Sequence, residues 1–385
     1  MQGEITTSKS FVVPPPGMGY HQRRSLLHHY MRRRRYLYLS ALAGLGAVAC
    51  QSKPVPPPET TPTPGQPVFL NGAGATFPSF LYLKWFVEYQ KLYPEVQISY
   101  QPIGSAAGIQ QFLTGTVDFA GSDVAMTDEE AAKVQRGALF VPMTAGSVAV
   151  VYNIPGVPTG LKLSRQVLPA IFLGQITRWN DPELAALNPE LTLPNLPITV
   201  VYRSDGSGTT AIFTSHLSAI DPLWKNQVGS GLTVNWPVGT GIKDNAGISA
   251  QIQQGEGVIG YVETAYAQQL KLTTAALENQ SGKFLLPTEN SVEKGVADVK
   301  LDAQLRGFIP DPASPEAYPI VSYSWFLIYQ KYEDKNKGET LRKFIKWALV
   351  EGQKFSLGLG YVPLPGPVVA QAQNLMQQHT LVASP

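Results

Sequence analysis

Short apolar strand patterns alternate with helical patterns from Val68 onward, and this alternation predicts an α/β fold. The first units are "PVFLNGAGATFP", a predicted strand followed by a Gly-rich turn, "PSFLYLKWFVEYQKLYP", a predicted amphipathic helix, and "VQISYQPIG", the next strand. The chain has 385 residues, of which 44% are hydrophobic, so it can bury cores for two domains of ordinary size.

Four longer patterns complete this interpretation of the chain from Val68 onward, which we call the body of the protein. Residues 147–155 predict a long apolar strand, and residues 208–220 predict a helix. Residues 318–330 predict a strand pair or one long strand, and residues 338–361 predict a C-terminal helix with its apolar residues at 3.6 spacing.

The N-terminal segment has the pattern of an export signal. Residues 31–50, "MRRRRYLYLSALAGLGAVAC", place four arginines before about fourteen mostly apolar residues. "AVAC" resembles a bacterial lipoprotein box, in which Cys50 is lipidated and becomes the mature N-terminus. A plain signal peptide with an incidental cysteine is the alternative. Residues 1–30 are interpreted as a spurious or disordered upstream extension, with Met31 as the start.

Residues 51–67, "QSKPVPPPETTPTPGQP", are dominated by Pro and Thr and predict a stiff, extended tether. Together with a lipidated Cys50, such a tether would hold a domain outside the cytoplasmic membrane. No other stretch of the sequence is long and apolar enough to span a bilayer.

Charge and metal-ligand counts exclude several classes of protein. The first 49 residues hold seven Lys/Arg and one acid, which leaves 23 basic and 27 acidic residues and a net charge of −4 for the rest. A mildly acidic body argues against nucleic acid as a partner. Cys50 is the only cysteine, and only His216 and His379 lie beyond residue 49, so the body offers no Cys- or multi-His metal site. We expect no cofactor.

Four turns with small polar residues follow predicted strands. They are Gly72–Phe77, Gly104-Ser105, Gly121-Ser122-Asp123 and Arg203–Thr209, "RSDGSGT". In an α/β sheet such turns gather at the carboxyl ends of strands, where ligands bind. Helix N-termini, hydroxyls and close backbone approach at glycine suit an oxyanion, and Arg203 would supply its countercharge.

Each turn alone has a structural alternative. Ser105 could be only a helix N-cap, and Gly72-x-Gly74 only a tight turn. Asp123 could be a cap or a solvated acid, and Arg203 could form a structural ion pair with Asp205.

Five motifs together closely resemble the periplasmic phosphate-binding protein of the phosphate ABC transporter, the PstS-like family. They are "GAGATFP", "GIQQFLTGTVDFAGSD", "RSDGSGTT", "WPVGTG" and "GVIGYVETAYA", and the similarity runs from about residue 69 to the C-terminus. The resemblance implies a two-lobed periplasmic binding protein (type II-like), each lobe a mixed sheet flanked by helices. The lobes would be residues 69–149 plus 318–385 and residues 150–317, with phosphate in the cleft between them.

The resemblance also implies the ligands of the anion. They are Thr76, Phe77 (through its N–H), Ser105, Asp123, Arg203, Ser207, Gly208 (through its N–H) and Thr209, with Asp205 supporting Arg203. One departure is Ala106-Ala107, where the family often has Ser and Gly, so no hydroxyl comes from those positions. The implied partners are inorganic phosphate and a membrane permease driven by a cytoplasmic ATPase. We expect the protein to act as a monomer.

The chemistry of Asp123 agrees with phosphate as the ligand. Phosphate near neutral pH carries at least one proton, and that O–H needs an acceptor when it is bound away from water. A fully ionised sulfate has no proton to give, so Asp123 would select against it.

Three other functions stay open from the residues alone. An enzyme is disfavoured because "DGSGTT" lacks the Lys of a P-loop and Ser207 has no evident base, since His216 lies nine residues on in the predicted helix. The second is a binder of another tetrahedral oxyanion such as sulfate, molybdate or tungstate, against which Asp123 argues. The third is a phosphate sensor or scavenger without a transport role.

Overall fold

The computed structural model describes residues 67–381. The predicted extension (1–30), the signal segment (31–50) with Cys50, and the predicted tether up to residue 66 lie outside the described residues. No helix among residues 67–381 is both long and apolar enough to cross a membrane.

One mixed sheet organises the described chain, with strand order β2-β1-β3-β12-β4-β8-β6-β7 and β9 paired to β4. A small separate sheet has the order β11-β10-β5. The strands of the main sheet are β1 Val68–Gly74, β2 Val96–Pro102, β3 Phe119–Ser122, β4 Ala138–Asn153, β6 Thr199–Arg203, β7 Thr240–Ile242, β8 Val258–Glu263, β9 Thr273–Thr274 and β12 Val321–Tyr329. Those of the small sheet are β5 Lys162–Leu163, β10 Ala276–Glu278 and β11 Phe284–Leu285.

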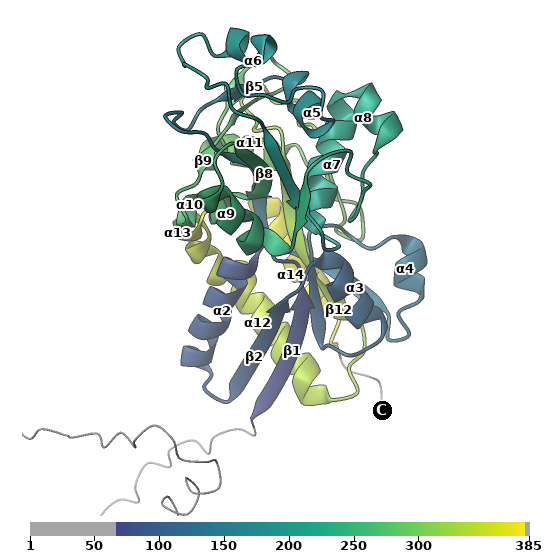
Figure 1. Ribbon diagram of the computed structural model, residues 1–385. Coiled ribbons are helices and arrows are strands. Elements are labelled where there is room, and N and C mark those ends of the chain that lie inside the picture. Colours follow the sequence, from purple (N-terminus) through teal and green to yellow (C-terminus); the bar gives the residue numbers. More distant parts are fainter. Residues whose placement is uncertain (1–66, 382–385) are drawn as a thin grey trace, which may run out of the picture. The chain divides into compact units, whose positions relative to one another are not determined.

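Helices flank the main sheet along its whole length (Figure 1). The helices are α2 Ser79–Leu92, α3 Ser105–Leu113, α4 Asp128–Ala132, α5 Val167–Phe172, α6 Pro182–Leu187, α7 Gly208–Ile220, α8 Pro222–Gln227, α9 Asp244–Gln254, α10 Thr264–Gln269, α11 Glu289–Ala297, α12 Lys335–Val350, the 3₁₀ turn η1 Gly352–Phe355, α13 Ser356–Leu359 and α14 Gly366–Gln378. In Figure 1, α2 and α12 lie beside β1 and β2, and α7 and α9 lie beside β8.

Strand β4 belongs to both halves of the sheet. Its first part, Ala138–Ser147, pairs antiparallel with β12, and its second part, Val148–Asn153, pairs antiparallel with β8. β3 and β4 are both antiparallel to β12, so β3 runs in the same direction as β4. β1 is parallel to β3 and therefore also runs in that direction. β6 is parallel to β8, so both run against β4. The carboxyl ends of the two sets of strands therefore face each other across the middle of β4.

Successive side chains of β4 and β8 point to opposite faces of the sheet, and each face packs against a different apolar core. Val150 and Tyr152 point into the large cluster, while Ala149 and Val151 point into a smaller cluster that includes Ile248 of α9. This is the period of two expected for a strand that is covered on both faces.

The predicted elements are largely confirmed, with corrections near the C-terminus. Residues 318–330 form one strand, β12, and the strand predicted at 147–155 is the second part of the longer β4. The prediction of one helix over 338–361 is wrong beyond Val350, because the chain turns at Gly352, whose carbonyl accepts a 2.7 Å hydrogen bond from Trp85 Nε1. A side chain at Gly352 would lie 2.9 Å from that nitrogen. Helix α14 was not predicted.

The contact between α3 and β1 leaves no room for a side chain at Gly108. A Cβ there would lie 2.4 Å from Gly74 Cα and 2.9 Å from the Ala73 carbonyl oxygen, and backbone cannot move aside cheaply. We expect Gly108→Ala to lower the free energy of unfolding by about 2–4 kcal/mol, measured by denaturant or thermal unfolding.

Gly366→Ala is the matched control, because nothing lies within 4 Å of a Cβ at that exposed position. Its free energy of unfolding should change by less than about 0.5 kcal/mol. Equal stability of the two variants would contradict the close approach of α3 and β1.

Candidate anion-binding site

The facing strand ends bring the predicted site residues into one place. β1 leads to Thr76 and Phe77, β3 to Asp123, and β6 ends at Arg203. We call the following residues the polar cluster: Thr76, Phe77, Ser105, Asp123, Arg203, Asp205, Ser207, Gly208 and Thr209. All of them are buried except Asp205, which is mostly buried.

Arg203 is the buried cation of the polar cluster, and one edge of its guanidinium is hydrogen-bonded to Asp205. Nε donates to Asp205 Oδ1 at 2.7 Å, and Nη2 donates to Asp205 Oδ2 at 2.5 Å. This pair holds the fork in one orientation. Nη1 is buried and has no hydrogen-bond partner among the described residues. Arg203 therefore keeps an unused, oriented donor.

Asp205 is held in turn by the start of α9. Its Oδ1 accepts a 3.1 Å hydrogen bond from the backbone N–H of Asp244. Partial burial acts to raise the pKa of Asp205, but the hydrogen bonds and charge of Arg203 outweigh it and hold that pKa below its ordinary value. The structural ion pair considered from the sequence is thus present.

Asp123 is the acceptor of the polar cluster, and it is 1% exposed. Ser324 Oγ donates to Asp123 Oδ1 at 2.8 Å, while Ser105 Oγ lies 3.4 Å from Oδ2. Burial raises the pKa of Asp123 to about 7, against the lowering effect of Ser324, Arg203 and Ser105. The solvated-acid alternative is wrong, because Asp123 is almost completely buried and its carboxyl group is hydrogen-bonded to Ser324.

Gly208 lies directly against Asp123 and Ser105. A Cβ at Gly208 would be 2.5 Å from both Asp123 Oδ2 and Ser105 Oγ, so only glycine allows this approach. α7 begins at Gly208, and the N–H groups of its first turn have no intrahelical acceptor. These N–H groups and the positive end of the helix dipole suit an anion beside Asp123.

Ser105 is not a helix N-cap. Gly104, with φ of 95°, occupies the cap position of α3, and Ser105 is its first helical residue. The Ser105 hydroxyl faces Asp123 instead, because the left-handed conformation of Gly104 shifts the helix start by one residue. The glycines of "GAGATFP" also differ from the tight-turn alternative, since Gly72 and Gly74 lie within β1 and pack against Phe119 and Gly121.

Ala106, where the sequence departs from the family pattern, contacts the turn formed by residues 203–209. Its backbone N–H donates to the Gly206 carbonyl at 3.0 Å, and a Cβ at Gly206 would lie 2.3 Å from Ala106 Cβ. The α3 start and the 203–209 turn are therefore in direct contact.

Ser207 and His216 do not form a nucleophile–base pair. Ser207 caps α7, its Oγ accepting from the Thr210 N–H at 3.1 Å. His216 Nδ1 lies 2.8 Å from the Pro310 carbonyl, and burial lowers the pKa of His216 to about 4. The expectation that His216 points elsewhere is confirmed.

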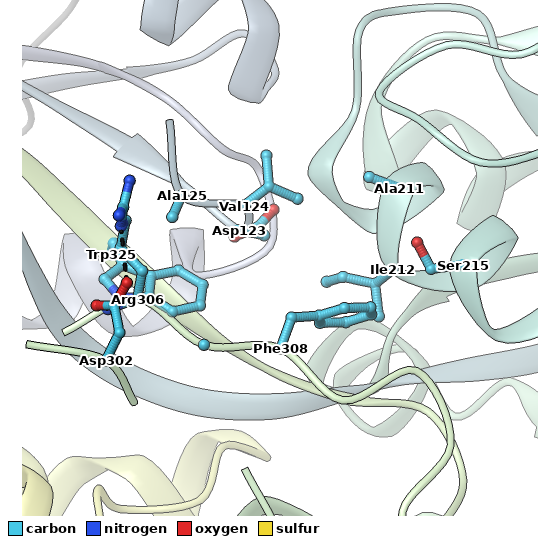
Figure 2. A pocket seen from close by; sticks show the side chains of 11 residues that line it. Asp123, Val124, Ala125, Ala211, Ile212, Ser215, Asp302, Arg306, Phe308 and Trp325 are labelled. Atoms are coloured by element: carbon cyan, nitrogen blue, oxygen red, sulfur yellow. Dashed lines mark hydrogen bonds and ion pairs between the residues drawn. The ribbon is translucent and has the colours of Figure 1, made fainter. Parts of the chain in front are cut away.

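A cavity of about 420 Å³ opens beside Asp123 (Figure 2). Asp123 and Val124 lie on one side of it, and Ala211, Ile212 and Ser215 of α7 on the other. Its only cationic lining residue is Arg306, which binds Asp128 and Asp302. This mostly apolar cavity does not include Arg203, and we interpret it as an approach to Asp123.

Sequence reasoning missed four residues around the polar cluster. Ser324 could have been found, because Ser322 and Ser324 are two polar residues on one face of the otherwise apolar β12. Tyr261 and Glu263 lie in the motif "GVIGYVETAYA" but were not singled out, and Asn245 gave no local signal. Tyr261 OH accepts from the Arg203 N–H at 3.2 Å, and Asn245 contacts Thr76 and Thr209.

The fold and the polar cluster together define a two-lobed α/β binding protein. A family profile described as "PBP superfamily domain" matches residues 57–351. The chain is 40% identical over 308 residues to the phosphate-binding protein PstS of Haemophilus influenzae, covering 79% of this chain and 91% of that protein. It is 38% identical to PstS of Pasteurella multocida, covering 79% and 88%.

The solved structure of a phosphate-binding protein from Stenotrophomonas maltophilia has the same fold, with a TM-score of 0.64 at 20% identity, covering 80% of this chain and 93% of that one. The chain belongs to the PstS family of phosphate-binding proteins, within the PBP superfamily.

The raised pKa of Asp123 makes ligand-free stability depend on pH. The folded protein binds a proton at Asp123 that the unfolded chain, with an ordinary Asp pKa, releases. Its contribution is fully present below the unfolded pKa near 4 and is lost as pH rises through about 7. We therefore expect Asp123→Asn to raise the thermal midpoint of phosphate-free protein at pH 8 by about 5 °C, and to raise it little at pH 4.5.

Differential scanning calorimetry of both proteins at the two pH values checks this. Glu263 also has a pKa raised mainly by burial and to a smaller extent by the charge of Asp123, so Asp123→Asn relieves part of that effect at pH 8 as well. A gain in midpoint that is equal at both pH values would contradict a buried carboxyl that is protonated only below about pH 7.

Proposed function

We propose that this protein binds inorganic phosphate at the polar cluster and delivers it to an ABC-type importer. The observation that carries the proposal is the buried Nη1 of Arg203, a cationic donor without a partner among the described residues, near the buried carboxyl group of Asp123. Membership of the PstS family supports the same ligand.

The proposed ligand set is the one expected from the sequence. Donors would be the Arg203 guanidinium, the hydroxyls of Thr76, Ser105, Ser207 and Thr209, and the N–H groups of Phe77 and Gly208. Asp123 would accept the proton of the phosphate, and Asp205 would orient Arg203. Helix N-termini at Ser105 and Gly208 support this assignment.

Selectivity against sulfate would follow from Asp123. Oδ1 already accepts from Ser324, and Oδ2, beside Ser105 and Gly208, is the oxygen that would take the phosphate proton. Sulfate would place an oxygen with no hydrogen against a buried carboxylate, and such mismatches reduce binding by roughly 10⁴–10⁵-fold.

We propose that lobe 1 comprises residues 69–149 plus 318–385 and lobe 2 residues 150–317, and that they close around the ion by hinge motion. The change of β4 partner between Ser147 and Val148, and the start of β12 at Val321, support crossovers close to these bounds. The closed form would then dock on a membrane permease driven by a cytoplasmic ATPase. The protein would be a monomer and would catalyse no reaction.

Isothermal titration calorimetry with phosphate tests the proposed function directly. We expect tight one-to-one binding, and a roughly 1000-fold excess of sulfate should not displace the phosphate. Equal heats for both ions, or no binding of phosphate, would contradict the proposal.

Arg203→Lys and Arg178→Lys form a matched pair for the same titration. Lysine cannot both bind Asp205 through two nitrogens and present a further donor, so Arg203→Lys should weaken phosphate binding by roughly 100-fold or more. Arg178 is exposed and bonded to Asn195, so Arg178→Lys should bind as the wild type does.

We also propose that the protein is exported and lipid-anchored through Cys50, on the basis of the "AVAC" motif. In bacterial cells, the full chain should fractionate with the membrane, and Cys50→Ser should release it or leave the precursor uncleaved. Immunoblotting of cell fractions and the mass of the N-terminal peptide check this. If the wild-type protein is soluble and its N-terminal peptide carries no lipid, the lipid-anchor proposal is wrong and the plain signal peptide remains.

A further inference from the structure

Asn245 is a buried side chain that connects two hydroxyls of the proposed ligand set. It lies in the first turn of α9 and is 0% exposed. Its Nδ2 lies 2.8 Å from Thr76 Oγ1 and 3.4 Å from Thr209 Oγ1. Thr76 follows β1 and Thr209 lies in the first turn of α7, so one amide group contacts a hydroxyl from each of the two facing sets of strand ends.

The orientation of the Asn245 amide is determined by Glu263. The backbone N–H of Glu263 donates to Asn245 Oδ1 at 3.1 Å. A backbone N–H can only donate, so the amide oxygen must face it and the NH₂ group must face the threonines. Because an NH₂ group only donates, both threonine oxygens act as acceptors toward Asn245.

The polarity of the two hydroxyls follows from this arrangement. Each hydroxyl has one hydrogen, and neither the Thr76 nor the Thr209 hydroxyl finds an acceptor for it within residues 67–381. Both hydroxyls are buried, so water does not readily take these hydrogens. The two hydrogens are therefore available to a ligand that needs donors.

We propose that Asn245 is a positioning residue that makes Thr76 and Thr209 donors to the bound anion. The inference rests on phosphate binding at the polar cluster. A phosphate that gives its proton to Asp123 needs donors at its other oxygens, and a threonine that accepted instead would leave two lone pairs facing each other. Asn245 donates to the two threonine oxygens and so directs their hydrogens toward the anion, without touching the anion itself.

Asn245→Asp reverses this polarity with almost no change of shape. An ionised Asp would accept from both threonines and turn their hydrogens away from the anion. We expect the variant to bind phosphate roughly 100-fold more weakly at pH 8.5, since hydrogen bonds to charged groups are the stronger class. Residue 245 is fully buried, so burial should raise the pKa of the introduced carboxyl group and protonate much of it at pH 5.5. The protonated group can again donate one hydrogen, so the ratio of variant to wild-type Kd should fall.

The Kd ratio isolates the substituted residue. Phosphate itself titrates, and so do groups around α9, but these are common to both proteins. The titratable and charged groups of this region are Asp123, Arg203, Asp205, Asp244, Glu263 and Tyr266. A role of Asn245 in packing alone would give a ratio that does not vary with pH.

Asn245→Ala removes the two donors without supplying an acceptor. The hydroxyls could then rotate freely, and we expect roughly 10-fold weaker binding with a ratio that is the same at both pH values. Ser249→Ala is the control on the same helix, because Ser249 Oγ donates to the Asn245 carbonyl at 2.8 Å and touches neither threonine. It should bind phosphate as the wild type does, even where its thermal midpoint is lower.

Calorimetry on the four full-length proteins at pH 5.5 and 8.5 decides the matter, with thermal unfolding as the folding check. Wild-type affinity in either Asn245 variant overturns the inference, and so does one pH-independent loss shared by both variants. Where Asn245→Asp does not fold, Asn245→Gln, which keeps an amide donor, takes its place: a smaller loss than in Asn245→Ala supports the donor role, and an equal loss overturns it. If the wild-type protein does not bind phosphate, the proposed function is wrong, and this outcome differs from one in which only the Asn245 variants behave unexpectedly.

Discussion

A buried guanidinium that is paired along only one edge determines what this site can hold. Asp205 takes Nε and Nη2 of Arg203, which lowers the cost of burying the cation and fixes its plane. The other edge keeps a donor with no partner among the described residues. Leaving a buried cationic donor without an acceptor is costly, so an acceptor that reached this edge would be stabilised by it.

The second constraint is that the carboxyl group of Asp123 is buried among these donors. Asp123 has Ser324 on one oxygen and Ser105 and Gly208 beside the other. Burial raises the pKa of Asp123, so without a ligand the ionised carboxylate is destabilised even though Arg203 is nearby. A ligand that brings its own proton relieves this conflict, because the carboxylate then accepts a hydrogen bond. Charge and hydrogen-bond polarity thus favour the same class of ligand.

The sheet explains how such a site can be assembled from distant segments. β1 and β3 run toward the middle of β4 from one side, and β6 and β8 run toward it from the other. Loops and helix starts at the carboxyl ends of all four strands therefore converge, although Thr76 and Asn245 are 169 residues apart. Because β4 is continuous through both halves, a small change of twist near Ser147 would alter the distance between the two sets of ends.

The sequence by itself determined the features that depend on neighbours along the chain. Alternation of strand and helix patterns, the Ser207 cap of α7 and the Arg203–Asp205 pair all follow from residues within a few positions of one another. The family motifs added the composition of the site for the same reason, since they are contiguous.

Only the tertiary structure decided which hydroxyls donate, which acid is buried and where helices end. Asn245 gave no signal because its partners Thr76, Thr209 and Glu263 are far from it in sequence. The end of α12 depends on Trp85, 267 residues away from Gly352, and the cap of α3 depends on the left-handed conformation of Gly104. Hydrogen-bond direction and burial are properties of packed surroundings, and packing is set only when the strands have been brought together.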